Sequence, residues 1–252
     1  MSAIAVPSDA AALGPSRRFD RLDALRGVAI VWMAVFHFCF DLNYFGFFEP
    51  KHRFTVDVFW TTQRTMIVSL FLFCAGLAQA VAMEQGQPWR RFWRRWAQIA
   101  GCAVLVSIGS YWMFPRSWIF FGVLHGIAVL LILIRLLAPL GRWLWLLGAL
   151  AIALPLLWRH EAFNGPWLSW IGLVARKPIT EDYVPVLPWL GVMAWGLAAG
   201  QWLLGRARAA FAAPIPRAAQ GLAWLGRWSL SFYMVHQPVL IGLLWAVVAM
   251  RR

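Results

Sequence analysis

Long apolar runs separated by short polar segments make up most of the chain. A helix that crosses a bilayer needs about 20 apolar residues, because the hydrocarbon core is roughly 30 Å thick and an α-helix rises about 1.5 Å per residue. Seven runs approach or reach this length: about 25–46, 66–83, 97–114, 118–138, 143–158, 185–204 and 228–250. The pattern predicts an all-α, polytopic transmembrane helix bundle of about seven spans, of which the fifth is the shortest.

The composition supports a single membrane domain. Of the 252 residues, 62% are hydrophobic and 13% are charged, whereas about 25% of the residues of a typical soluble domain are charged. The seven runs leave no room for a separate soluble domain. We therefore expect residues 20–252 to form one transmembrane domain, and residues 1–19, which are rich in Ala, Ser and Pro, to form a disordered N-terminal segment.

The positive charge of the chain predicts its topology rather than a nucleic-acid partner. The net charge is +13, and fourteen of the 23 Lys and Arg residues fall on one side of the predicted bundle, leaving nine on the other. Segments rich in Lys and Arg stay in the cytoplasm. The N-terminus is therefore expected to be cytoplasmic and, with seven spans, the C-terminus external. The expected partner of the apolar surface is the lipid bilayer.

The first predicted span contains the densest set of polar residues. Its positions at steps of 4, 3, 4, 4 and 3 share one helix face: Arg26, Ile30, Met33, His37, Asp41 and Tyr44. Ionisable groups inside a span cost several kcal/mol and mark candidate functional sites. A carboxylate at i+4 can orient an imidazole and raise its basicity, so His37 and Asp41 are candidate catalytic residues. The alternative is a structural hydrogen bond to a neighbouring helix.

Two further histidines lie within predicted spans, His125 in FGVLHGIAV and His236 in SFYMVHQPVL, where Tyr233 shares a face with His236. Each histidine alone is compatible with a packed core residue, but three on different helices must all find polar partners inside the bundle. Arg64, just before the second span, could reach Asp41 or could extend to the membrane interface. The candidate substrate- or cofactor-binding residues are Arg26, Arg64, His125, Tyr233 and His236.

The remaining motifs concern metals and the membrane surface. Cys39, Cys74 and Cys102 fall inside predicted spans without a CxxC pair or metal-ligand spacing, so we expect buried cysteines and no metal site. The segment WRRFWRRW (89–96) is predicted to be part of a cytoplasmic loop that binds anionic headgroups. Its arginines also suit the phosphates of a nucleotide-bearing cosubstrate.

Five strings of the chain resemble one bacterial family: RLDALRGVAIVWMAVFHFCFDLNYFG (21–46), LFLFCAGLAQA (70–80), FFGVLHGIAVLL (120–131), VPVLPWLGVMAWGLAAG (184–200) and LSFYMVHQPVLIGLL (230–244). This is the heparan-alpha-glucosaminide N-acetyltransferase-like family, related to the membrane acyltransferase superfamily. The resemblance covers about 20–250. It implies a multi-pass acyltransferase-like domain in the bacterial inner membrane, with acetyl-CoA as cosubstrate. The acetyl group would pass from cytoplasmic acetyl-CoA to an amino sugar or a sugar hydroxyl on the far side of the membrane.

The resemblance also implies roles for single residues. The residues that match the family's motifs are Asp23, Arg26, His37, Asp41, His125 and His236. In the animal enzyme the histidine assigned to catalysis lies in the external loop after the first span, and its counterpart by position here is His52. The base is therefore His37 or His52, and the better-matched motif favours His37.

Three other functions fit parts of the pattern. A proton-coupled small-molecule transporter would use the same histidines and Asp41 as a proton relay. A haem protein would use the histidines as iron ligands. A scaffold protein would need no ionisable residues inside its spans. The acceptor is not specified by the sequence. Nor is the oligomeric state: Gly191, Gly196 and Gly200 form a small-residue face that suits a homo-oligomer or packing within one bundle.

Overall fold

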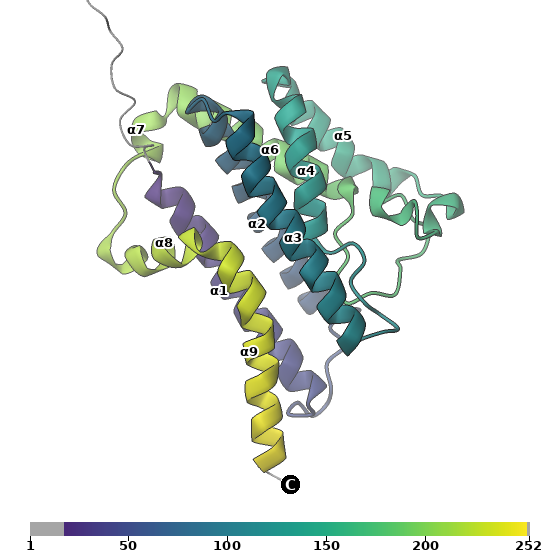
Figure 1. Cartoon of the computed structure of the whole chain (residues 1–252). Helices are drawn as coiled ribbons and strands as arrows, with labels where there is room; N and C mark the ends of the chain where they lie inside the picture. Colours follow the sequence, from purple (N-terminus) through teal and green to yellow (C-terminus); the bar gives the residue numbers. More distant parts are fainter. Residues whose placement is uncertain (1–17, 251–252) are drawn as a thin grey trace, which may run out of the picture.

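The described part of the protein, residues 18–250 of a computed structural model, is helical (Figure 1). Within it the chain forms isolated β-bridges but no strand. The α-helices are α1 (Asp20–Tyr44), α2 (Val58–Glu84), α3 (Trp89–Met113), α4 (Val123–Leu137), α5 (Trp143–Leu157), α6 (Val186–Arg206), α7 (Arg208–Phe211), α8 (Gln220–Arg227) and α9 (Ser229–Met250). The expected disordered segment 1–19 lies outside the described residues except for its last two. Of these, Phe19 is buried and stacks on Phe211, with 4.6 Å between ring centroids.

The predicted all-α membrane fold is confirmed, with six helices of membrane-spanning length among the described residues where about seven spans were expected. Six described helices are long and apolar enough to cross a bilayer: α1, α2, α3, α4 with the 3₁₀ turn that follows it, α6 and α9. The fifth predicted span forms α5, which has 15 residues and therefore a length of roughly 22 Å. The segments before α4 and α6 lie together, because the Val184 N–H donates to the Phe121 carbonyl at 3.1 Å. Because α4 and α6 start at the same end of the bundle, the chain must cross back from the end of α4 to the start of α6. Helix α5 provides most of that crossing.

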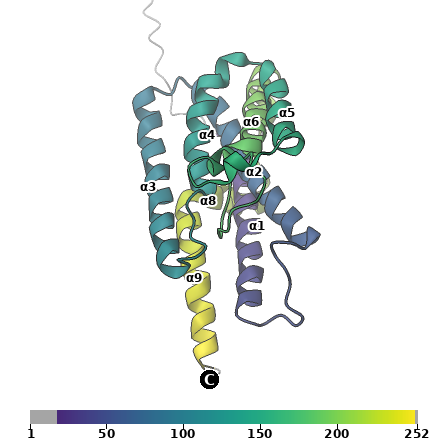
Figure 2. The ribbon, with the colours of Figure 1, turned by 90° about the vertical axis from the view of Figure 1, so that its right-hand side faces the viewer.

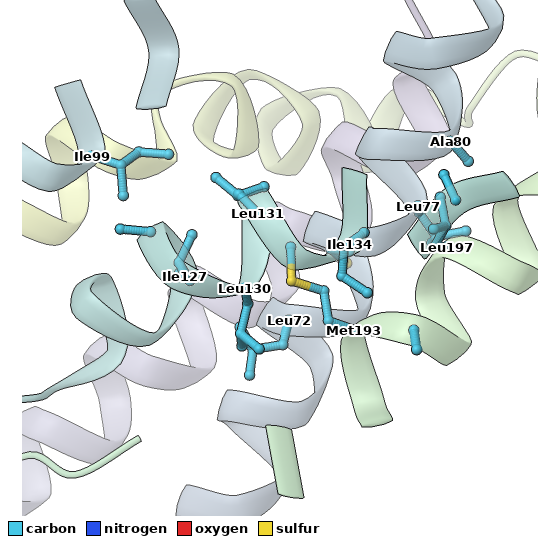
Figure 3. Packing of buried hydrophobic residues seen from close by; sticks show 14 of the residues in the cluster. Leu72, Leu77, Ala80, Ile99, Ile127, Leu130, Leu131, Ile134, Met193 and Leu197 are labelled. Atoms are coloured by element: carbon cyan, nitrogen blue, oxygen red, sulfur yellow. The ribbon is translucent and has the colours of Figure 1, made fainter. Parts of the chain in front are cut away.

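The central helices α2, α4, α5 and α6 pack closely because small residues lie where they cross. A Cβ on Gly196 would overlap the Phe73 carbonyl of α2, and a Cβ on Gly191 would overlap the backbone of α5 at Gly148. Gly200 similarly faces Ala80 of α2. The small-residue face of the sixth predicted span is thus used within this bundle, where it brings the large side chains into contact (Figure 3). Among the fully buried ones are Leu72, Leu130, Ile134, Met193 and Leu197.

Helices α1, α8 and α9 pack against one another beside the central helices. A Cβ on Gly27 of α1 would overlap the Leu222 carbonyl of α8, and a Cβ on Gly226 of α8 would overlap the Asp23 carbonyl of α1. The two helices therefore touch along their backbones. From this contact α9 runs beside α1, and both extend beyond the central helices at the same end (Figures 1 and 2).

The two ends of the bundle differ in charge. One end, called here the arginine-rich end, contains the start of α1 and the connections 85–88, 138–142 and 207–219. Its contacts include an ion pair between Arg227 and Asp20 at 2.7 Å and another between Arg208 and Glu84. Arg135 donates to the Gln87 carbonyl there at 2.6 Å. We predict that this end faces the cytoplasm, from the distribution of Lys and Arg.

Two local predictions are wrong. The segment 89–96, expected in a loop, forms the first two turns of α3, with Phe92 buried and the Trp96 indole donating to the Ala128 carbonyl at 2.8 Å. Arg64, expected before the second span, lies inside α2 as its seventh residue. In both cases the helix continues beyond the apolar run, because a helical backbone satisfies its own hydrogen bonds whatever its side chains are.

Candidate functional site

A hydrogen bond between α1 and α9 connects the two ends of the chain. The side-chain amide of Gln237 donates to both carboxylate oxygens of Asp41, at 2.8 and 3.1 Å. Asp41 is 3% exposed, and a carboxylate buried to this degree needs such a donor. Among the described residues Asp41 has no hydrogen bond to His37 or ion pair with Arg64, so the expected direct contacts to these two residues are absent. Asp41 instead fixes α9 against α1.

This connection places His37 and His236 side by side. Their ring centroids are 5.1 Å apart and the ring planes are inclined by 77°. His236 is buried and His37 is half-buried. Periodicity placed each histidine on the inner face of its own helix, and the fold brings the two faces together. The site therefore contains two imidazoles in contact, on helices from opposite ends of the sequence.

The hydrogen bonds of His236 define which of its nitrogens is free. Its Nδ1 lies 2.8 Å from the Tyr233 carbonyl, which can only accept, so Nδ1 carries the proton. In a neutral ring Nε2 then bears a lone pair. This buried Nε2 has no hydrogen-bond partner among the described residues, and neither has Oε1 of Gln237. The ring that contacts His37 thus has one unused acceptor, Nε2 of His236.

Aromatic side chains separate this pair from the loop 45–57. Phe36 contacts both His37 and Trp60, with ring centroids 5.8 and 5.9 Å apart. Trp60 in turn contacts His52 at 5.8 Å. His52 is exposed, and its backbone N–H and carbonyl both bond to the side chain of Asn43. His52 is therefore positioned by its loop but lies two rings away from the histidine pair.

His125 occupies a different part of the structure and has both nitrogens in use. The Ser107 hydroxyl donates to the Ile119 carbonyl at 2.7 Å, so its oxygen is free to accept from Nε2 of His125 at 3.0 Å. Nδ1 of His125 accepts from the Gly122 N–H at 3.2 Å. These bonds hold the start of α4 against α3. The geometry favours a positioning role for His125 over direct contact with a substrate.

Arg64 faces a polar cavity at the end of the bundle opposite the arginine-rich end. The cavity has a volume of about 60 Å³ and is lined by α2, the start of α6 and the segment before it, at Arg64, Thr65, Val68, Asp182, Tyr183, Val184 and Trp189. Asp182 accepts a hydrogen bond from the Val123 N–H at 2.6 Å. Burial raises the pKa of the Asp182 carboxyl, while this bond and the charges of Arg64 and Lys177 oppose the rise. Asp182 was not among the predicted site residues.

Arg26 lies at the arginine-rich end and faces the interior. It pairs with Asp23 at 3.2 Å, its side chain is 27% exposed, and its charge acts on Cys74 of α2 and Arg95 of α3. The Arg95 guanidinium donates to Gln98 at 3.1 Å. Because the two like charges act on each other, they repel unless an anion lies near both, and a phosphate group would offset this repulsion.

No group of three or more His, Cys, Asp and Glu within residues 18–250 is placed to hold a metal ion. The three in-span histidines do not form one cluster, because His125 is bonded to α3 while His37 and His236 contact each other.

The sequence of the chain matches a known family. The sequence model described as "Heparan-alpha-glucosaminide N-acetyltransferase, catalytic" matches residues 18–238. The chain belongs to this family. The match includes both members of the His37–His236 pair and ends just after Gln237. Heparan-alpha-glucosaminide N-acetyltransferases are membrane acetyltransferases that use acetyl-CoA as donor, which agrees with the six membrane-length helices. No curated protein and no solved structure matches the chain.

Proposed function

We propose that this chain transfers the acetyl group of acetyl-CoA to the amino group or a hydroxyl group of a sugar, in the inner membrane of a bacterium. The observation that carries the proposal is the His37–His236 pair, which lies within the matched family region and has an unpartnered Nε2. Acyl transfer to an amine or alcohol needs a base that removes the proton of the nucleophile. A neutral imidazole suits this task.

His37 is the base in this proposal, and His236 determines which nitrogen of the His37 ring carries the proton. In the proposed reacting state an N–H of His37 turns toward Nε2 of His236, which has no partner in the structure, and the other nitrogen of His37 presents its lone pair to the acceptor. As the acceptor nitrogen or oxygen bonds to the thioester carbonyl carbon, its proton passes to His37. The C–S bond then breaks, and the CoA thiolate takes the proton as it leaves. Asp41 acts through Gln237 as a positioning residue that keeps α9 in place.

The donor would enter from the arginine-rich end. Arg26 and Arg95 are proposed to bind its phosphates, since Arg guanidinium groups match phosphate oxygens in charge and geometry. His37 lies about 11 residues, or roughly 16 Å, further along α1 than Arg26. The extended pantetheine arm would span this distance and bring the thioester to the histidine pair. Tyr233 and Arg64 remain candidates for contacts with the acceptor, and a glycan or amino sugar is the proposed acceptor class.

The test combines donor binding with turnover. Detergent-purified protein should show saturable thermal stabilisation by acetyl-CoA and not by ATP. With acetyl-CoA and glucosamine, release of free CoA thiol should fall by about 10²–10⁴ in His37→Gln, because general-base assistance contributes roughly this factor. His236→Gln should lower the same rate. His52→Gln is the matched control and should keep wild-type turnover. Full turnover in His37→Gln, together with loss in His52→Gln, would assign the base to the loop instead.

A further inference from the structure

Helix α3 lies at the edge of the bundle and turns one face away from it (Figure 2). Its buried residues are Phe92, Ile99 and Ala103. Positions at steps of 4, 3, 4, 4, 3 and 4 share the opposite face, at residues 90, 94, 97, 101, 105, 108 and 112. All seven are exposed. This set, called here the outer face of α3, therefore contacts the surroundings along the whole helix.

The outer face changes from basic to apolar along the helix. It begins with Arg90 and Arg94, and the exposed Arg91 lies beside them. Further along, its exposed residues include Leu105 and Ile108. Apolar side chains exposed on a membrane-length helix contact lipid chains. A phospholipid has the same division, because its charged headgroup lies above its apolar chains. The order of charge and hydrophobicity on this face therefore matches that of a phospholipid.

The length of α3 places the arginines at the level of the headgroups. The helix has 25 residues, or about 37 Å, which exceeds the roughly 30 Å of a hydrocarbon core. The exposed Trp112 near its end suits one membrane interface, so the excess extends among the headgroups at the other. This excess of about 7 Å is roughly the first five residues and includes Arg90 and Arg91. Arg94 follows directly, and its long side chain extends to the same level.

These arginines have no acidic partner. The segment 85–118 contains no Asp or Glu. The ion pairs of the described chain use other arginines, namely Arg26, Arg176, Arg208 and Arg227. The side chains of Arg90, Arg91 and Arg94 make no hydrogen bond or ion pair with another described residue. Three positive charges on adjacent turns repel one another, and an anionic group among them would offset this repulsion.

Two tryptophans beside the arginines have fixed positions. The rings of Trp89 and Trp93 stack with centroids 6.1 Å apart, and both side chains are partly exposed. The guanidinium of Arg135 lies over the Trp89 ring at 4.5 Å and is itself bonded to the Gln87 carbonyl. Indole rings favour the headgroup level of a bilayer. Because these rings are already ordered, little conformational entropy is lost when a headgroup binds beside them.

We propose that the outer face of α3 binds an anionic phospholipid, with its phosphate among Arg90, Arg91 and Arg94. One acyl chain follows the same face past Gly101, where the surface is open, toward Leu105. A free phosphate would match the arginines alone, whereas a phospholipid also covers the apolar part of the face. Guanidinium groups suit the phosphate in charge and geometry. The binding of this lipid does not depend on acetyl transfer.

Lipid binding is measured by native mass spectrometry on the detergent-purified full chain. The probes are phosphatidylglycerol, which is anionic, and phosphatidylcholine with the same acyl chains, which has no net charge. A basic residue near an anionic surface contributes about fivefold to binding, so phosphatidylglycerol should bind about 10–100-fold more tightly. The double variant Arg90→Gln/Arg94→Gln should weaken phosphatidylglycerol by about 25-fold and leave phosphatidylcholine unchanged. Arg90→Lys/Arg94→Lys, which keeps both charges, should retain most of the binding.

Arg206→Gln/Arg217→Gln is the matched control. Both arginines are exposed and lie outside α3, so this variant removes the same charge and should keep phosphatidylglycerol binding. Equal weakening by the two Gln double variants would overturn the proposal, as would equal affinity of the folded wild-type protein for the two lipids.

Unchanged phosphatidylglycerol binding in Arg90→Gln/Arg94→Gln would also overturn the proposal, and two further readouts would identify what the face binds instead. Loss of stabilisation by acetyl-CoA in this variant would assign the arginines to the cosubstrate. Loss of a dimer from the mass spectrum would assign the face to a second copy of the chain. The acetyltransferase proposal is tested separately by turnover.

Discussion

The Asp41–Gln237 contact should be one of the strongest single links between α1 and α9. Substituting Gln237 with Ala leaves a carboxylate that is 3% exposed without its donor. Substituting Asp41 with Ala leaves the amide unpaired. Each single variant should lower the free energy of unfolding by about 1–3 kcal/mol, the cost of an unsatisfied buried polar group. The double variant loses both partners at once and should be less destabilised than the sum of the single variants.

The difference is the coupling energy, and it should be about 1.5–3 kcal/mol, the usual contribution of a hydrogen bond to a charged group. Unfolding by SDS titration in mixed micelles measures all four members of the cycle. Gln201→Ala is the control, because its amide donates at 3.0 Å to the backbone carbonyl of Ala138, a neutral acceptor far from Asp41 in the sequence. Combined with Asp41→Ala it should be additive within roughly 0.5 kcal/mol. Equal additivity for Asp41→Ala with Gln237→Ala would refute the contact.

Three further changes test other parts of the structure. Gly226→Val should destabilise the protein by about 1–3 kcal/mol in thermal unfolding, because the added side chain forces α8 away from the α1 backbone. In the control Gly221→Ala the added methyl group meets open space, so the unfolding temperature should be unchanged or raised. Burial raises the pKa of the Asp182 carboxyl in the folded protein. The stability of the wild-type protein should therefore fall as the pH rises from about 3.9, the ordinary pKa of an aspartate, through the raised pKa of Asp182. Asp182→Asn should lack this fall; coincident pH profiles would contradict the assignment. Tyr183→Phe removes a 2.6 Å bond to the Ser169 carbonyl and should cost about 0.5–1.5 kcal/mol, seen as faster amide exchange around Ser169; unchanged protection would argue against the bond.

Hydropathy predicted the helices because bilayer thickness sets a length that a linear sequence can display. It located the apolar centre of each helix better than its ends. The second and third spans were expected from 66 and 97, yet α2 begins at Val58 and α3 at Trp89. The additional turns contain charged and aromatic residues, including Arg64. Their helical structure follows from backbone hydrogen bonding and from packing, neither of which hydropathy measures.

Helical periodicity likewise found half of the site. It placed His37 and Asp41 on one face of α1, and that face is turned inward at Asp41. It paired them with each other, whereas the fold pairs them with His236 and Gln237 on α9. Partners on another helix follow no local pattern. Gln237 was visible only as a polar residue next to His236 in an apolar segment, a signal that would have justified including it.

The bond between Asp41 and Gln237 joins residues that are 196 positions apart, which has a consequence for biosynthesis. At about 5–20 residues per second, Gln237 leaves the ribosome roughly 10–40 s after Asp41. During that interval α1 is already made, while the donor for its buried carboxylate does not exist. The insertion machinery, or water, must therefore solvate Asp41 until α9 arrives. The histidine pair is completed only when α9 has been made, so the acetyl transfer proposed above requires that α9 has emerged and packed against α1.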